Sequence, residues 1–231
     1  EDPNEPAVIK AVSSDGHASC GPALSVIGAA QPIVANVQLL LVQQQQQRHR
    51  HHQAASVAVP PPCLKIVASG GTDSAVGPVV MGCNITVHAT KSDGNGAAAT
   101  AIQICGPGTC CIVLGCDVCS AGDAVHVLSG ALPSIRCNCI HNGGGFGAVF
   151  SGDGTAGSFV ENDVFQTQDS GVYITDHAGP DVMRNHIHGS LGSGIFVRGL
   201  GSGGRLEGNQ VFDNGADGIT VADHASPVAT Q

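Results

Sequence analysis

Short segments of alternating apolar and polar residues recur at a fixed interval in the second half of the chain. The clearest markers are three Asn residues that lie 23 and 24 positions apart, namely Asn162, Asn185 and Asn209. An apolar residue precedes each Asn by three positions, and a Gly-led segment with alternating apolar residues begins nine positions after it. These series are Phe159, Val182 and Leu206, and the segments that begin at Gly171, Gly194 and Gly218. Three short period-2 segments per repeat predict a coil of three β-strands.

The same pattern continues toward the N-terminus, so the repeat covers most of the chain. It recurs over 137–150, 115–127, 83–104 and 37–66, and a partial coil precedes these around Leu24. The sequence therefore predicts an all-β protein, a right-handed single-stranded parallel β-helix solenoid. We expect about seven coils of about 23 residues, with three short strands in each coil.

The extent of the repeats defines the expected domain organisation. We expect an N-terminal extension over 1–20 and the parallel β-helix over 21–231. Two early coils carry extra residues between the same two strands: a Gln-, His- and Pro-rich insertion at 43–62 and a shorter one at 90–99. Insertions at one corner of a solenoid project from one edge of the stack. The low-complexity composition of 43–62 predicts a loop without fixed structure.

One column of residues is expected to face the lumen at a corner of every coil. Its members are Cys83, Cys116, Asn138, Asn162, Asn185 and Asn209. In coils about 4.8 Å apart, stacked Asn side chains can bind the backbone and one another. We interpret the four Asn residues as a structural ladder, and we expect the Cys residues to fill the same space without making that bond.

The composition agrees with a thin core that many similar layers share. Gly occurs 33 times, aromatic residues make up 3% of the chain and charged residues 12%. Small aliphatic side chains are sufficient for such a core. The net charge of −9 argues against nucleic acid and anionic membranes as partners. No apolar run approaches the ~20 residues of a membrane-spanning helix.

The ten cysteines bear on the compartment. Several alternate or adjoin along the expected strands, such as Cys137 with Cys139 and Cys110 with Cys111. Five disulfides are one interpretation, and buried free thiols in a reducing compartment are the simpler one. The acidic, proline-rich residues 1–6 do not resemble a signal peptide. We therefore expect an intracellular protein, cytoplasmic or associated with the cytoskeleton.

Two acidic positions bear on polysaccharide chemistry. Asp176 belongs to a segment, 172–177, that is similar to a signature stretch of pectate lyases, and Asp223 lies two coils further on. Stacking places these carboxylates roughly 10 Å apart, too far to share a Ca²⁺ ion. Arg198 lies in the coil between them, which predicts a charge-balanced corner. No basic residue stands in a groove of acids, as a lyase or epimerase requires, so we expect no enzyme and no catalytic residue.

The histidines and cysteines do not predict a metal site. His186 and His188 share one side of a strand, but the neighbouring coils place Phe beside His188, and His141 lies two coils away, roughly 10 Å. The spacing of Cys116 and Cys119 resembles half of a zinc knuckle, yet Cys116 should face the lumen. Zinc requires its ligands around one centre at ~2.0–2.3 Å. We therefore expect no metal and no cofactor.

The Gly-led strands carry the candidate partner-binding residues. Their outward positions in successive coils include His126, Val149, Tyr173, Phe196 and Thr220. If the register holds, Val149, Tyr173 and Phe196 form an exposed apolar and aromatic stripe. Such a stripe either packs under a loop or a neighbouring domain, or it serves as a docking strip for a protein or a stacking platform for sugar rings.

The segments 182–188 and 206–214 resemble the parallel β-helix repeats of the carbohydrate-binding and sugar-hydrolase superfamily. The greatest similarity is to the β-helix of F-box-only substrate receptors and SHC-binding proteins, over 110–224, although no F-box is visible. The resemblance implies a non-catalytic β-helix that binds or scaffolds other proteins as a piece of a larger protein or assembly. The alternative is a carbohydrate-binding or polysaccharide-active β-helix, which would gather several carboxylates and a cation on one face.

Overall fold

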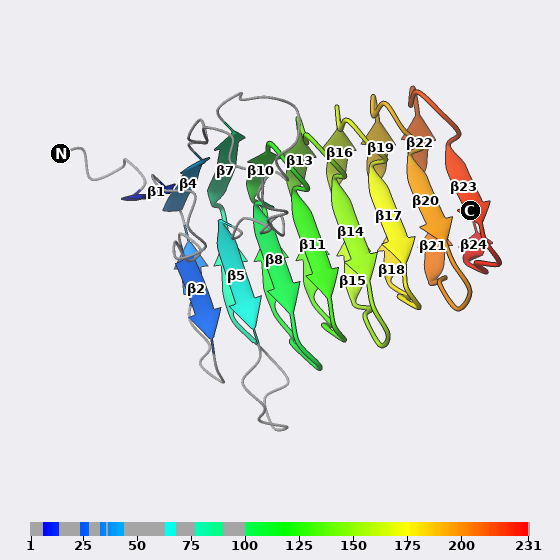
Figure 1. The fold of residues 1–231 in the computed structure, drawn as a ribbon, viewed down its shortest axis with the longest axis horizontal. Helices are drawn as coiled ribbons and strands as arrows, with labels where there is room; N and C mark the ends of the chain where they lie inside the picture. The colour runs from blue at the N-terminus through cyan, green and yellow to red at the C-terminus, as the bar shows by residue number, and fades with distance from the viewer. Residues whose placement is uncertain are drawn as a thin grey trace, which may run out of the picture.

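The structure is a computed structural model that describes residues 7–13, 24–27, 33–35, 37–43, 63–67, 77–89 and 100–230. Within these ranges, 24 strands form three parallel sheets of eight strands each. Successive coils follow one another along the long axis of the molecule, from blue at the N-terminal side to red at the C-terminal side (Figure 1). None of the described segments is a helix long and apolar enough to cross a bilayer.

Each sheet takes one strand from every coil. Sheet A consists of β1 (Ala7–Ser13), β4 (Val37–Gln43), β7 (Asn84–Ala89), β10 (Asp117–Ser120), β13 (Cys139–His141), β16 (Asp163–Phe165), β19 (His186–His188) and β22 (Gln210–Phe212). Sheet B consists of β2 (Leu24–Ile27), β5 (Leu64–Val67), β8 (Ile102–Cys105), β11 (Val125–Leu128), β14 (Ala148–Ser151), β17 (Val172–Thr175), β20 (Ile195–Arg198) and β23 (Ile219–Ala222). Sheet C consists of β3 (Ile33–Ala35), β6 (Val79–Met81), β9 (Ile112–Leu114), β12 (Ser134–Arg136), β15 (Ser158–Val160), β18 (Asp181–Met183), β21 (Arg205–Glu207) and β24 (Val228–Thr230).

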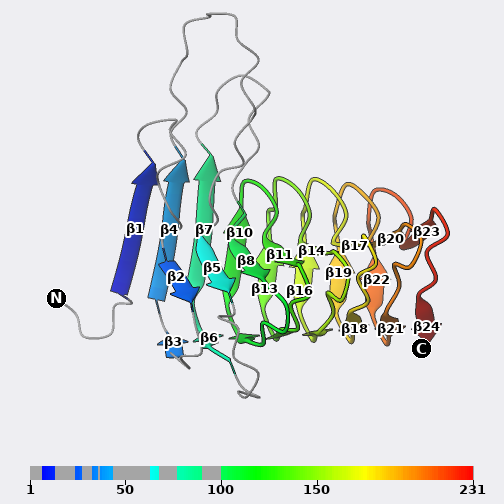
Figure 2. The same ribbon diagram turned by 60° about the horizontal axis from the view of Figure 1, so that its bottom comes forward.

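The register follows the sequence repeat. Asp163 pairs with His186, and His186 pairs with Gln210, which are the 23- and 24-residue intervals of the pattern. Both views show the strands of one sheet side by side, coil after coil (Figures 1 and 2). The prediction of an all-β parallel β-helix with three short strands per coil is confirmed. The number of coils differs slightly from the expected seven, because each sheet has eight strands. The first of these in sheet A, β1, lies within the expected extension 1–20 and pairs with β4.

The two expected insertions begin and end on the same sheets. The segment 43–62 separates β4 of sheet A from β5 of sheet B, and 90–99 separates β7 of sheet A from β8 of sheet B. Both therefore belong to the corner between sheets A and B. Apart from Gln43, their residues lie outside the described part of the chain.

Small aliphatic side chains fill the lumen in columns. In sheet A the middle residues Val118, Ile140 and Val164 are completely buried one above another. Only two of the chain's Phe residues join them, Phe150 and Phe159, whose rings meet edge to face at 6.0 Å. Full burial of such side chains contributes roughly 1.5–3 kcal/mol each. The lumen is thus built from similar layers and needs few large residues.

A left-handed backbone residue turns the chain from sheet C into sheet A. Cys137, Glu161 and Arg184 occupy this corner with φ of 55°, 56° and 53°. Gly115 and Gly208 take the same place in other coils, both with φ of 60°. Glycine adopts this conformation without the steric cost that other residues bear there. The residue after the corner points into the lumen. At these corners it is the Asn of the repeat except after Gly115, where it is Cys116.

The Asn side chains connect one coil to the next through a chain of hydrogen bonds. Asn162 Oδ1 accepts hydrogen bonds from the backbone N–H of Asn138, at 3.0 Å, and from Asn138 Nδ2, at 2.9 Å. Asn162 Nδ2 in turn donates to the carbonyl of Ile135 at 3.0 Å. Asn185 and Asn209 repeat this arrangement. The structure thus places all four Asn residues of the expected ladder in one connected column.

Cys116 continues this column in the preceding coil with weaker chemistry. Its Sγ lies 3.8 Å from the carbonyl of Val80 and 3.5 Å from that of Leu114, so the thiol makes long donor contacts. Its backbone N–H donates to Asn138 Oδ1 at 2.9 Å. The backbone N–H groups of Asn138, Asn162 and Asn185 donate to the next Asn in the same way. A thiol supplies no oxygen for the coil before it, so the Asn bonding pattern ends at Asn138.

Candidate functional site

The outer faces hold most of the large aromatic residues. The chain has six Phe and one Tyr, and only Phe150 and Phe159 lie in the lumen. The others form two columns, Phe146, Tyr173 and Phe196 over sheet B and Phe165 and Phe212 over sheet A. The solenoid core does not require aromatic residues on its outside. These columns are therefore the first candidates for a functional surface.

Tyr173 and Phe196 form the centre of the sheet B column. They are direct partners in the register, and their ring centroids lie 5.4 Å apart with planes tilted by 40°. Both side chains are half-buried. Phe146, in the turn before β14, extends the column because its ring stacks on Tyr173 at 4.7 Å. The sequence pattern did not identify Phe146, since it lies in a turn outside the three repeated series.

Val149 differs from the expected exposed stripe. It pairs with Tyr173 as the repeat predicts, but its side chain is only 5% exposed. Phe146 lies three residues earlier in the same coil, and its ring occupies the outside of sheet B next to Tyr173. A short Val side chain at this level is therefore covered. The stripe on sheet B consists of Phe146, Tyr173 and Phe196, and we call it the aromatic strip.

His126 and Thr220 lie at the two ends of the same column and bind neighbouring side chains. His126 Nε2 lies 3.2 Å from Ser151 Oγ, and Thr220 Oγ1 lies 2.7 Å from Ser193 Oγ. Burial lowers the pKa of His126, and the nearby Asp123 opposes this shift only in part. The imidazole is thereby favoured in its neutral form. Both residues border the aromatic strip.

Arg198 adds a cation to the strip. It follows Phe196 by two positions on β20 and therefore points to the same face. Its Nε donates to Asp223 Oδ2 at 2.5 Å, and this bond is the main cause that raises the pKa of Arg198, with a smaller effect from Tyr173. Asp176 accepts instead from the hydroxyl of Thr175 at 3.3 Å. The expected charge-balanced corner is thus an ion pair of Arg198 with Asp223.

The His126–Ser151 pair resembles part of a catalytic triad. A triad also requires a carboxylate that orients the imidazole. Asp123 is the carboxylate whose charge acts on His126. However, its Oδ1 accepts a hydrogen bond from the backbone N–H of Phe146 at 2.9 Å. Burial raises the pKa of Asp123 as well. In the described residues no hydrogen bond joins Asp123 to His126, so the third member of a triad is not in place.

A second column of rings runs along sheet A. His141, Phe165, His188 and Phe212 stack in that order, with centroid separations of 5.2, 5.3 and 4.8 Å and interplanar angles of 13°, 10° and 6°. The repeat predicts that these residues share a column, and the structure shows that the rings lie nearly parallel. Each inner ring is therefore covered on both faces by its neighbours.

Two of these histidines bind a carboxylate in the coil before them. His141 Nε2 lies 2.7 Å from Asp117 Oδ1, and His188 Nε2 lies 3.2 Å from Asp163 Oδ1. Next to the first pair, Cys139 is the direct register partner of Asp117. One donor atom from each of Asp117, Cys139 and His141 falls within 4.8 Å of the other two. The sequence pattern did not identify this group, because its members are three different residue types on two coils and no repeated column contains all three.

Cys116 takes no part in that group, because it is 1% exposed and faces the lumen. No disulfide joins the nine cysteines that the structure describes. Burial, and to a smaller extent Cys110, raises the pKa of the Cys111 thiol to about 12. A thiol with so high a pKa stays protonated and is a poor nucleophile.

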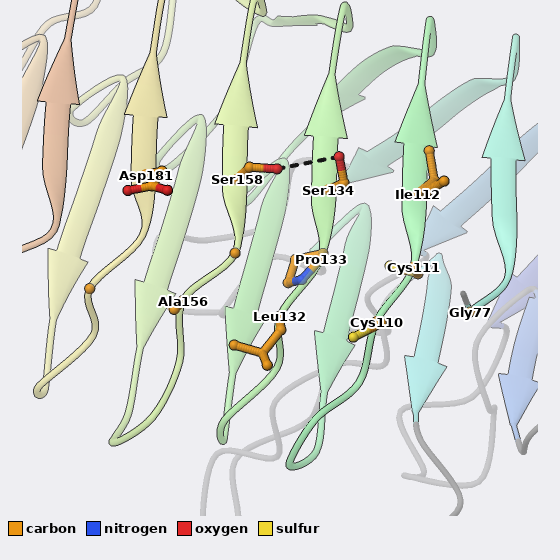
Figure 3. A pocket seen from close by; sticks show the side chains of 12 residues that line it. Gly77, Cys110, Cys111, Ile112, Leu132, Pro133, Ser134, Ala156, Ser158 and Asp181 are labelled. Atoms are coloured by element: carbon orange, nitrogen blue, oxygen red, sulfur yellow. Dashed lines mark hydrogen bonds between the residues drawn. The ribbon is translucent and has the colours of Figure 1, made fainter. Parts of the chain in front are cut away.

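A shallow groove of about 490 Å³ crosses the outside of sheet C (Figure 3). Ser134 and Ser158 lie on neighbouring strands of its wall and share a hydrogen bond of 3.3 Å, and Asp181 is their partner on the next strand. The remaining lining is Gly77, Cys110, Cys111, Ile112, Leu132, Pro133, Ala156, Gly157 and Gly179. The groove pairs its one carboxylate with no cation or imidazole, so it offers a recess rather than acid–base chemistry.

Comparison with known proteins identifies the repeat. The family model described as "Right handed beta helix region" matches residues 78–230. No curated protein and no solved structure shows significant similarity to the chain.

Proposed function

Since the chain belongs to the right-handed β-helix family, we propose that it is a non-catalytic solenoid that binds or scaffolds other proteins through the aromatic strip. The family hosts several kinds of activity, so the fold alone does not select one. The proposal depends on the side chains that the outer faces carry.

The observation that carries the proposal is the placement of the aromatic residues. Of seven Phe and Tyr residues, five lie outside the lumen in ordered columns. Tyr173 and Phe196 of the strip and the neighbouring Arg198 are residue types that are common at the centres of protein interfaces. The tilted contact between Tyr173 and Phe196 leaves part of each ring accessible. A flat strip of this kind suits the surface of another protein.

Ring geometry favours a protein over a sugar as ligand. Sugar-binding aromatic residues present a ring face, because the face is the electron-rich side that packs against a ligand. On sheet A, Phe165 and His188 are stacked on both faces. On sheet B, Tyr173 is contacted by Phe146 and Phe196. The inner rings Phe165, His188 and Tyr173 therefore expose mainly their edges, which pack well against mixed side chains of a protein.

Two candidate sites among the described residues, the His126–Ser151 pair and the groove over sheet C, lack a paired acid and base, which supports a non-catalytic role. Asp123 does not orient His126, and the groove over sheet C has a single carboxylate. A polysaccharide-active enzyme would need a paired acid and base within reach of one bond. The carbohydrate alternative remains an outcome of the test below.

The proposed setting is intracellular. Nine described cysteines without a disulfide agree with a reducing compartment. There the solenoid would act as a substrate receptor or as a rigid part of an assembly, as its resemblance to F-box-only receptors and SHC-binding proteins implies. Co-purification of a stable partner with the full chain is the corresponding readout.

Proximity labelling with the full chain tests the proposal. The test variant is Tyr173→Ser with Phe196→Ser on sheet B, and the matched control is Phe165→Ser with Phe212→Ser on sheet A. Each variant loses two aromatic side chains from an outer face, so a general effect of lost aromatics appears in both. Circular dichroism checks that each variant keeps the β-helix.

We expect the sheet B variant to lose a specific set of labelled proteins that the wild type and the sheet A variant keep. Equal labelling by all three proteins would contradict the strip as a docking site. Binding of a purified acidic polysaccharide by the wild type, lost in the sheet B variant, would replace the proposal with the carbohydrate alternative.

A further inference from the structure

The geometry points to a zinc site on the outer face of sheet A, with Asp117, Cys139 and His141 as ligands. The site lies on a different face from the aromatic strip and does not depend on the proposed function. The sequence pattern does not predict this site, because no cysteine spacing and no histidine column contains all three residues.

Two adjacent strands place the three side chains together. Asp117 begins β10 and Cys139 begins β13, and the two residues are direct partners in the parallel register. His141 follows Cys139 by two positions, so all three side chains point away from the lumen. The His141 Nε2 to Asp117 Oδ1 distance is 2.7 Å, and the three donor atoms lie within 4.8 Å of one another. Ligand atoms around a tetrahedral zinc ion are roughly 3.3–3.8 Å apart, so small side-chain rotations suffice.

The donor set selects the metal. A thiolate, an imidazole and a carboxylate together suit Zn²⁺, whereas Ca²⁺ and Mg²⁺ take oxygen ligands. Three protein ligands leave a fourth position for water. Cys119 is the register partner of His141 on β10 and is the nearest further thiol on this face of the two strands.

Neighbouring residues hold His141 in the orientation that a metal requires. Its ring stacks on Phe165 at 5.2 Å. Its second nitrogen, Nδ1, accepts a hydrogen bond from Asn142 Nδ2 at 2.8 Å. If the Asn142 side-chain amide is rotated by 180°, its Oδ1 faces His141 and accepts a hydrogen bond from Nδ1–H. In this tautomer the lone pair of His141 Nε2 is available to the metal. Metal-binding histidines usually have such a partner on their other nitrogen.

The surrounding charge favours a cation. Asp117 and Asp163 are the register partners of Cys139 on the two neighbouring strands of sheet A. A bound divalent ion neutralises these carboxylates and stabilises the thiolate. Two coils further on, Asp163 and His188 form a similar diagonal pair, but His186 stands where Cys139 stands in the first group. Among the described residues, only the group with Cys139 has three donor atoms within 4.8 Å of one another.

Cobalt titration of the full chain tests the site, with Co²⁺ alone as the probe in place of zinc. Co²⁺ bound to a thiolate gives a ligand-to-metal charge-transfer band, which separates this site from metal held by imidazoles alone. The test variants are Cys139→Ser and His141→Ala. The matched controls are Cys137→Ser, which removes an exposed thiol two residues away, and His188→Ala, which removes the equivalent imidazole of the second pair.

We expect the wild type to develop the charge-transfer band with one Co²⁺ per chain, and Zn²⁺ to displace it. The band should be lost in Cys139→Ser, weakened or lost in His141→Ala and kept in both controls. A wild type without the band, or a band that survives Cys139→Ser or disappears in Cys137→Ser, would overturn the site. Circular dichroism of each variant shows that the loss does not come from unfolding, since all four side chains lie outside the lumen.

Discussion

The lumen and the outer faces of this solenoid differ in what determines their residues. In the lumen, Val118, Ile140 and Val164 repeat nearly the same side chain in the same place, because each layer must fit the next. On the outside of the same strands, Cys119, His141 and Phe165 share a column yet have little chemistry in common. The fold constrains the first set and leaves the second open. Order among the outer residues, such as stacked rings or clustered ligands, therefore points to a role beyond folding.

The largest expected difference in stability is between the loss of an aromatic ring in the lumen and the loss of one on an outer face. Phe159→Ala removes a fully buried side chain that also packs against Phe150, and we expect it to lower the free energy of unfolding by about 3–5 kcal/mol. Phe165→Ala, on the outer face, should cost about 1 kcal/mol. Urea denaturation of both variants measures the difference. Similar losses in the two variants would mean that the outer rings stabilise the fold as much as the lumen rings do.

We expect the next largest loss of stability when the Asn ladder is interrupted. Asn162→Ala deprives the backbone N–H of Asn138, the amide of Asn138 and the carbonyl of Ile135 of their partners. Buried groups without partners cost about 1–3 kcal/mol each, and relaxation of neighbours keeps the total to about 2–4 kcal/mol. The control is Gln210→Ala, at an exposed position at the start of β22 in sheet A. It should change the free energy of unfolding by less than about 0.5 kcal/mol. An Asn162→Ala variant as stable as this control would refute the ladder as a stabilising element.

The smallest effect concerns His126, which borders the aromatic strip. Burial lowers its pKa in the folded protein, so the folded state binds this proton less readily than the unfolded state. The resulting stability is present above the unfolded pKa of about 6.5 and is lost as the pH falls through the lower folded value. Thermal unfolding of the wild type and His126→Gln between neutral and mildly acidic pH should show a steeper loss in the wild type. Parallel curves would indicate that His126 is accessible to solvent.

The sequence predicts the lumen of the solenoid better than its outer faces. The period of 23 and 24 residues predicts strands, register and the Asn column, because every coil repeats the same steric problem. It does not predict the cover over Val149 by the ring of Phe146. The same turn position holds Asp123 and Ser170 in the neighbouring coils, so no aromatic residue recurs there. It also does not predict that Asp117, Cys139 and His141 meet, because the similar pair of Asp163 and His188 has no thiol beside it and the group of three is not repeated. Outer sites of a solenoid depend on single coils, and only the register shows which residues become neighbours.

The proposed function requires that a protein lies against the aromatic strip on sheet B. A photo-crosslinking phenylalanine analogue placed at Phe196 tests this claim directly, and the same analogue at Phe212 on sheet A is the matched control. Both positions already hold a Phe on an outer face, so the substitution is conservative in each. We expect a discrete crosslinked protein from position 196 that Tyr173→Ser suppresses, and no such product from position 212. No crosslink from position 196, or the same products from both positions, would contradict the account.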